Sequence, residues 1–295
     1  MADYALSCCS TADLTLDHFN RRDIRWVPFH YELDGVQHLD DLYQTMDAQT
    51  FYDAMAAGAD TKTSQINVQE FKDHFEKILA EGKNILHVTL SSGISGVIQS
   101  AEIAASEVMK EHPGALIYVV DSLAASSGYG LLMDKLADLR DAGMPLEELN
   151  SWALANRLHV HHWFYSTDLT FFIKSGRVSK VSGFFGTALK ICPLLNVDRF
   201  GRLIPREKIR TKKRAAKAAL AKMVEHADTG TDYAGKVYIS QSACRADAEE
   251  LAAMIESTFP KLNGSVQIYD IGTTIGSHTG PGTIALFFWG DKRVD

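Results

Sequence analysis

Residues 84–96 read Asn-Ile-Leu-His-Val-Thr-Leu-Ser-Ser-Gly-Ile-Ser-Gly, a short apolar run that ends in a loop of serine and glycine. The run at 84–90 has the length and composition of a buried strand. A helical pattern follows the loop to about His112, and a second apolar run comes next at 115–120. The order strand, loop, helix, strand predicts a parallel sheet with crossover helices.

The same alternation continues toward the N-terminus. Residues 67–81 repeat apolar side chains at helical spacing. Residues 25–33 read as a strand and are followed by Asp34-Gly35, a sequence that favours a tight hairpin turn. We therefore predict a parallel α/β domain over 1–160, with a hairpin insertion near 24–45.

The pattern of predicted strands and helices changes in the second half of the chain. Short helices are expected at 168–174 and 182–189, and residues 198–202 (Asp-Arg-Phe-Gly-Arg) have the composition of a hairpin turn. The regular crossover spacing of the first half is absent. We predict an α+β domain over 161–295, so the fold class is α/β with two domains that share a large interface.

Composition excludes several classes of protein. The chain has 295 residues, a formal charge of −7, 46% hydrophobic residues and 23% charged residues, which are ordinary values for a soluble globular protein. No apolar run approaches the ~18 residues of a membrane helix. The four cysteines lack both a disulfide framework and zinc-site spacing, so a cytoplasmic protein with free thiols is expected. The acidic balance argues against nucleic acid as a partner.

Three stretches are rich in hydroxyl side chains, glycine or both: 61–65 (Thr-Lys-Thr-Ser-Gln), 91–96, and 276–282 (Gly-Ser-His-Thr-Gly-Pro-Gly). In α/β proteins, ligands bind in loops at the carboxyl ends of strands, and helix N-termini there offer unpaired N–H groups to an anion. Each stretch alone is explained as well by helix caps and turns. Together they favour a site for a carboxylate or a phosphate, although none has the spacing of a nucleophile elbow or a P-loop.

Two groups of charged or titratable residues have less specific interpretations. His159, His161 and His162 have no carboxylate among them, so exposed or packed histidines at the domain junction are expected rather than a metal site. Residues 206–214 hold six basic residues in nine, which predicts a solvated helix start. A docking patch for an acidic partner, or one arginine turned inward to an anion, are the alternatives for that segment.

With these residues in view, nearly the whole chain resembles the DegV family of bacterial fatty-acid-binding proteins. Six motifs occur in the family's order and spacing, and their conjunction is specific where one alone would be weak. They are Ser-Thr-Ala-Asp at 10–13, Thr-Ser-Gln at 63–65, the loop at 91–96 followed by Gln-Ser-Ala at 99–101, Gly-Arg-Val-Ser-Lys at 176–180, Ile-Arg-Thr at 209–211, and His-Thr-Gly-Pro-Gly at 278–282. Two positions depart from the pattern: Cys9 stands where an acidic residue is usual, and Ile66 where proline is common.

The resemblance implies a two-domain fold that holds one long-chain fatty acid, of about C16–C18, in a tunnel between the domains. It implies no cofactor and no metal. It further implies that the protein is not itself an enzyme but the carrier subunit of a bacterial fatty acid kinase. Such a carrier presents the carboxylate to a separate ATP-binding kinase subunit, which makes acyl phosphate for phospholipid synthesis.

The resemblance also assigns residues. It implies that Thr63 and Ser95 hold the carboxylate, with His278 and Arg210 nearby. Arg177 and Lys180 are the candidates for partner docking. The supporting loop residues are Ser64, Gln65, Ser92, Gly93, Gly96, Thr279 and Gly280. The residues that line the tunnel, or else form ordinary core, are Phe164, Phe171, Phe172, Phe184, Phe185 and Leu189.

Two other functions remain open at this point. In the first, the chain is a stand-alone acyl hydrolase in which His278 activates Ser95, since a nucleophilic serine needs a base within hydrogen-bond reach. In the second, it is a regulatory lipid sensor whose basic loops bind a different protein.

Overall fold

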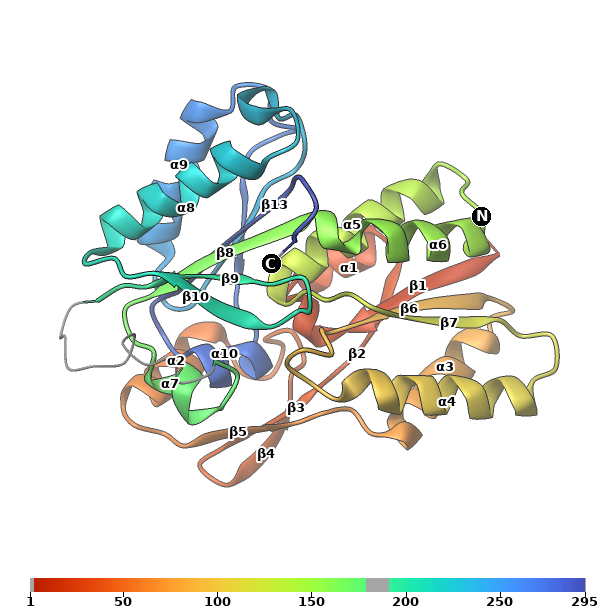
Figure 1. Cartoon of the computed structure of the whole chain (residues 1–295). Helices are drawn as coiled ribbons and strands as arrows, with labels where there is room; N and C mark the ends of the chain where they lie inside the picture. The colour runs from red at the N-terminus through yellow and green to blue at the C-terminus, as the bar shows by residue number, and fades with distance from the viewer. Residues whose placement is uncertain (1–2, 179–190, 295) are drawn as a thin grey trace.

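The computed structural model describes residues 3–178 and 191–294. Its first half is built on the predicted parallel sheet, with strand order β2-β1-β6-β7 (Figure 1). The strands are β1 (Tyr4–Cys9), β2 (Ile24–Val27), β6 (Asn84–Thr89) and β7 (Ile117–Asp121). Helices α3 (Val68–Leu79) and α4 (Val97–Glu111) cover one face. The other face carries α1 (Leu16–Arg21), α5 (Ser126–Asp141) and α6 (Leu146–Asn156).

A small antiparallel sheet of order β4-β3-β5 lies beside the parallel one. Its strands are β3 (His30–Leu33), β4 (Val36–Leu39) and β5 (Thr61–Ser64), and α2 (Ala48–Ala56) connects the last two. The hairpin expected at Asp34-Gly35 is present, and both residues have positive φ, 49° and 82°. The single strand expected at 25–33 is wrong, because Pro28 interrupts it and sends β2 and β3 into different sheets.

The second half contains one six-stranded sheet of order β10-β9-β8-β13-β11-β12. Helices α8 (Lys212–His226) and α9 (Arg245–Thr258) lie on its outer side in Figure 1. The strands are β8 (Val160–Ser166), β9 (Leu194–Val197), β10 (Leu203–Glu207), β11 (Tyr238–Gln241), β12 (Gln267–Asp270) and β13 (Thr283–Trp289). The short helix α7 (Thr170–Lys174) follows β8, and the helix expected at 182–189 lies outside the described residues.

Two of the stretches expected to be loops have regular structure. Residues 61–64 form strand β5, in which Thr63 pairs with Tyr31. Residues 273–279 form helix α10 (Thr273–Thr279) and overlap the loop expected at 276–282. Serine, threonine and glycine are weak helix formers, so tertiary contacts have overridden local propensity here. Although α10 comes late in the chain, it packs against β3, β5 and α2 of the first half.

A buried ion cluster joins the two halves of the chain. The Asp134 carboxylate, 3% exposed, forms an ion pair with Lys236 and accepts hydrogen bonds from Tyr238 at 3.0 Å and His18 at 3.1 Å. Arg22 completes the cluster at 3.3 Å. Burial alone raises the pKa of Asp134, but these hydrogen bonds and positive charges outweigh it and hold the pKa well below its ordinary value. The carboxylate is therefore ionised throughout the neutral range.

We expect Asp134→Asn to lower the free energy of unfolding by about 3 kcal/mol, because it removes the buried carboxylate on which Lys236, Arg22, Tyr238 and His18 converge, while Asp138 still pairs with the two partly exposed cations. Because the pKa is lowered in the folded protein, this contribution is present above pH ~4 and is lost as the pH falls through the folded value. Urea unfolding of wild type and variant at pH 7 and pH 3 measures both effects. Asp138→Asn is the matched control: its carboxylate is 38% exposed, and a loss of under ~1 kcal/mol is expected. Equal losses in the two variants would contradict the assignment.

Candidate functional site

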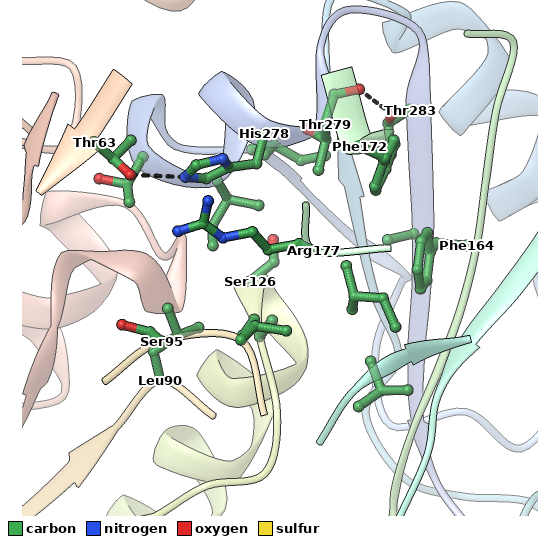
Figure 2. Close-up of a pocket in the computed structure, with 18 of the residues that line it drawn as sticks. Thr63, Leu90, Ser95, Ser126, Phe164, Phe172, Arg177, His278, Thr279 and Thr283 are labelled. Atoms are coloured by element: carbon green, nitrogen blue, oxygen red, sulfur yellow. Dashed lines mark hydrogen bonds between the residues drawn. The ribbon is translucent and has the colours of Figure 1, made fainter. Parts of the chain in front are cut away.

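A cavity of about 640 Å³ lies where the three sheets approach one another (Figure 2). Both halves of the chain line it: β5 and the 91–96 loop from the first, and β8, α10 and β13 from the second. Its walls are largely apolar, and Thr63, His278 and Arg177 lie together in one part of it, the polar side (Figure 2). Its lining also includes Leu90, Ser95, Ser126, Phe164, Phe172, Thr274 and Ala285.

Thr63 and His278 form the centre of the polar side. The Thr63 Oγ1 and the His278 Nε2 share a hydrogen bond of 2.7 Å, drawn dashed in Figure 2. Thr63 is placed by the register of β5 on β3, and His278 by the last turn of α10. The His278 Nδ1 is buried and has no hydrogen-bond partner among the described residues. The pair thus retains unused hydrogen-bonding capacity.

Electrostatics at this side favours an anion. Burial, and then the charge of Arg177, lower the pKa of His278 to about 4, so the ring is neutral at pH 7. Arg177 lines the cavity, and burial lowers its pKa, with no carboxylate from residues 3–178 or 191–294 offsetting the effect. A guanidinium remains charged under any physiological condition. The polar side therefore carries an uncompensated positive charge beside neutral hydrogen-bonding groups, an arrangement that suits a carboxylate.

Ser95 faces this group across the cavity (Figure 2). Its Oγ accepts a hydrogen bond from the Val97 backbone N–H at 3.3 Å at the start of α4. No hydrogen bond joins Ser95 to His278 in the described part of the chain, and the imidazole Nε2 is engaged by Thr63 instead. The serine–histidine contact that a stand-alone hydrolase requires is therefore not formed in this structure.

The apolar part of the cavity extends away from the charged side. Phe164 of β8 and Phe172 of α7 stack there, with ring centroids 5.9 Å apart. Phe171, which the sequence also suggested for the tunnel, does not line it and packs on Gly280 instead. Gly280 has a φ of 68° and leaves no room for a Cβ beneath that ring. The other three suggested lining residues, Phe184, Phe185 and Leu189, lie outside the described residues.

The remaining predicted site residues separate into two groups. Ser64, Gln65, Gly96 and Thr279 line the cavity, whereas Ser92, Gly93 and Gly280 do not. Gly93 has a structural reason: a Cβ there would lie 2.5 Å from the carbonyl oxygen of Gly201, at the tip of the β9–β10 hairpin.

Of the two predicted arginines, only Arg177 lines the cavity. Arg210 is exposed between β10 and α8 and does not line the cavity. Arg177, expected at a docking surface, supplies the guanidinium at the polar side; Lys180 lies outside the described residues. The Gly-Arg-Val-Ser-Lys motif was the available signal for Arg177, but a basic loop does not by itself reveal which way its arginine points. Sequence reasoning also did not identify Ser126 and Thr274 as lining residues.

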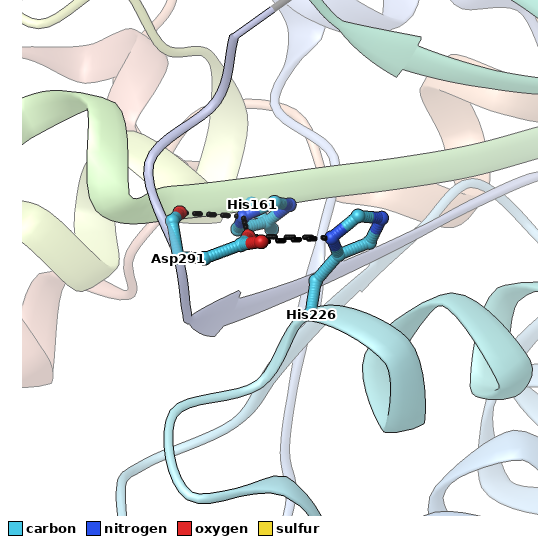
Figure 3. A group of neighbouring side chains, drawn as sticks. All are labelled: His161, His226 and Asp291. Carbon is cyan, nitrogen blue, oxygen red and sulfur yellow. Dashed lines mark hydrogen bonds and ion pairs between the residues drawn. The ribbon is translucent and has the colours of Figure 1, made fainter.

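The histidines near residue 160 meet a distant carboxylate (Figure 3). The His161 Nε2 lies 2.9 Å and the His226 Nδ1 3.2 Å from the same oxygen of Asp291, which is remote from both in sequence. The two rings stack at 17° to each other, with centroids 4.9 Å apart. An ion bound to an imidazole nitrogen lies in the plane of that ring, and two nearly parallel stacked planes share no such point. The geometry is that of a carboxylate bridging two imidazoles.

No helix in the described ranges 3–178 and 191–294 is both long and apolar enough to span a membrane.

Comparisons with known proteins agree with this architecture. The sequence profile of the DegV family, described as uncharacterised protein, matches residues 9–291. A "Fatty acid-binding protein" of Thermotoga maritima is 30% identical over 282 residues, 94% of each chain. A DegV lipid-binding protein from Thermotoga maritima has a similar structure, with a TM-score of 0.86 at 28% identity and 100% of both chains covered. The Streptococcus pneumoniae Fatty Acid Kinase (Fak) B3 protein, loaded with linoleic acid, shares the fold with a TM-score of 0.84 at 24% identity, over 99% of this chain and 100% of that one.

Proposed function

Because this chain belongs to the DegV family, we propose that it binds one long-chain fatty acid in the cavity and presents the carboxylate to a separate ATP-dependent kinase subunit. A single observation carries the first part: an apolar cavity of suitable size has one positively charged, hydrogen-bonding side. The similarity of the chain to a fatty-acid-binding protein of Thermotoga maritima and to a fatty acid kinase protein loaded with linoleic acid supports the proposal.

The size of the cavity agrees with a C16–C18 acid. If a methylene occupies about the volume of a water molecule in the liquid, roughly 30 Å³, then 640 Å³ has room for about twenty carbons. Burying about fourteen methylenes at ~0.8 kcal/mol each offers roughly 11 kcal/mol before the costs of binding. Those costs remove several kcal/mol and still leave a tight complex. The apolar walls thus supply affinity, and the polar side fixes the orientation of the chain.

The carboxylate is assigned to Thr63, His278 and Arg177, with Ser95 on the opposite wall. A buried carboxylate needs donors for its oxygens, since its desolvation otherwise dominates. In this proposal Arg177 takes the role that the sequence suggested for Arg210. Part of the Arg177 side chain remains exposed, so a partner at this side reaches the carboxylate without opening the protein. The carrier itself performs no chemistry.

We also propose two domains that meet near residue 160, with the cavity between them, and action in the cytoplasm where ATP is available. Every described strand up to Asp121 belongs to the first two sheets, and every described strand from Val160 onward belongs to the third. All four cysteines are free thiols, which is usual for a reducing compartment.

Native mass spectrometry of the purified protein tests the ligand class directly. We expect a retained mass equal to one C16–C18 acid, and loss of that mass in a Thr63→Val, Ser95→Ala double variant. Retention unaffected by the double substitution would remove these residues from the head-group site.

Incubation of the loaded protein with the ATP-binding kinase subunit and hydroxylamine tests the carrier role, because acyl phosphate is trapped as a hydroxamate. Hydroxamate formed without the kinase subunit, or none with it, would contradict the carrier role.

Binding is expected to take up protons below pH 7. The pKa of His278 is about 4 in the empty protein, below the ordinary value of about 6.5, so the empty site favours the neutral ring. A bound carboxylate beside the ring raises that pKa, so ligand binding draws a fraction of a proton between pH 5 and pH 7 and affinity rises as the pH falls. Calorimetry in two buffers of different ionisation enthalpy measures this uptake. His278→Gln should abolish it; uptake that persists there must come from another group.

A further inference from the structure

Two buried carboxylates lie beneath the first turn of α10. Asp13 is 4% exposed and has a left-handed backbone conformation (φ 48°) directly after the short 3-10 helix 10–12. Asp40 is 1% exposed and follows β4. Both belong to the first half of the chain, whereas α10 comes from the second. Neither residue belongs to the carboxylate site described above.

The two side chains converge on one point of the α10 backbone. The Asp40 Oδ2 accepts a hydrogen bond from the Thr274 N–H at 3.3 Å. At Gly272, which precedes the helix, a Cβ would lie 2.6 Å from the Asp13 Oδ1 and 3.5 Å from the Asp40 Oδ1. The other Asp13 oxygen accepts from the Ser126 hydroxyl at the start of α5. The carboxylates therefore fill the space that a side chain at Gly272 would occupy.

The helix depends on such external contacts. It has only seven residues, is rich in serine, threonine and glycine, and begins at a glycine that has no side chain to cap it. Unpaired N–H groups of a first helical turn must find acceptors when they are buried. Asp40 supplies one, and Asp13 lies against the same turn. His278 follows Thr274 by four residues, about one helical turn, so the two lie on the same face of α10.

No cation among the described residues balances the charge of Asp13 and Asp40. Burial raises the pKa of Asp13 well above its ordinary value, and the neighbouring charge of Asp40 raises it further, while the Ser126 hydroxyl acts in the opposite direction. Burial likewise raises the pKa of Asp40, and the hydrogen bond that the Thr274 N–H donates to it acts in the opposite direction. Both carboxyl groups are therefore protonated more readily than an ordinary aspartate.

We infer that Asp13 and Asp40 are positioning residues for the fatty-acid carboxylate: they fix the first turn of α10 and, through it, hold the His278 ring against Thr63. This inference rests on the proposed function of the cavity. Neither residue touches the ligand. Their role is to fix the position of α10, the helix that contains His278 and packs against the first half of the chain.

The test compares palmitate with hexadecanol, which fills the same apolar space without a carboxylate. For Asp40→Ala we expect palmitate to bind about 10-fold to 100-fold more weakly, the range for losing one charged hydrogen bond, while hexadecanol affinity changes by less than about 3-fold. Asp40→Asn keeps an acceptor for the Thr274 N–H and should restore most of the palmitate affinity. Gly272→Ala inserts a Cβ against both carboxylates without removing either, and should lower palmitate affinity selectively.

A double-mutant cycle establishes whether the effect passes through His278. Once His278→Gln is present, adding Asp40→Ala should weaken palmitate binding by less than about 2-fold, because residues that act through one another are not additive. Equal losses for palmitate and hexadecanol, or full additivity in the cycle, would overturn the positioning role and indicate general destabilisation. If Asp40→Ala does not fold, Gly272→Ala takes its place in the cycle, and Asp40→Asn remains the variant that should bind palmitate nearly as well as wild type. Wild-type protein that binds neither ligand, or both equally, would instead refute the proposed function.

Discussion

Replacing Arg177 by methionine is expected to weaken palmitate binding by about 100-fold at pH 7.5, with hexadecanol binding nearly unchanged. Methionine keeps an unbranched side chain but removes the one positive charge that reaches the polar side of the cavity in the described structure. A hydrogen bond to a charged group contributes roughly 1.5–3 kcal/mol, and 2.7 kcal/mol corresponds to about 100-fold in Kd. Displacement of a fluorescent fatty acid measures both ligands under the same conditions.

Arg210→Met is the matched control for this prediction. Arg210 is exposed and does not line the cavity, so its replacement should change palmitate affinity by less than about 2-fold. Comparing the two variants therefore tests whether the carboxylate lies beside Arg177, as the structure indicates, or beside Arg210, as the sequence suggested. A large loss for Arg210→Met with none for Arg177→Met would show that the guanidinium at the head group has been wrongly assigned.

Ala285→Phe is expected to shorten the acyl chain that the protein accepts by about four carbons. Ala285 of β13 lines the cavity and pairs with Phe164 of β8. Figure 2 shows Phe164 on the other side of the cavity from Thr63. The new ring displaces roughly four methylenes, which at ~0.8 kcal/mol each amounts to about 3 kcal/mol, or more than 100-fold in Kd for a C18 acid. A C12 acid should bind as it does to wild type.

A series of saturated acids from C10 to C20, measured against wild type, Ala285→Val and Ala285→Phe, checks this prediction. The valine variant should give a smaller shift in the same direction. Overpacking costs of about 1–3 kcal/mol are acceptable as long as thermal unfolding remains cooperative. A uniform loss across all chain lengths would mean that Ala285 does not lie along the acyl chain, and the tunnel would have to run elsewhere.

The parallel core could be predicted from sequence because its determinants are local. The run at 84–90, the glycine-rich loop and the helix after it satisfy the same periodicity rules that hold in the structure. Asn67 even forms the reciprocal cap with Glu70 that such a helix start favours. Strand β5 and helix α10 were missed because their formation depends on partners distant in the chain.

Some of the site residues could likewise be predicted from the sequence, and others could not. Thr63, Ser95 and His278 were identified from motifs, and the structure brings Thr63 and His278 into contact. The choice between Arg177 and Arg210 depended on the direction in which each side chain points, which spacing does not encode. Asp13 and Asp40 were not identified as relevant to α10, because their contacts with it span more than 230 positions of sequence.

The position of β13 between β8 and β11 has a consequence for biosynthesis. A polypeptide emerging from the ribosome can complete the four-stranded sheet early, but its second half lacks a central strand until residues 283–289 have been translated. His278 emerges only shortly before that strand. Residues of β13 also line the cavity, so the cavity is complete only once that strand has been synthesised. If the protein binds fatty acid as proposed, loading of the acyl chain would follow the synthesis of β13.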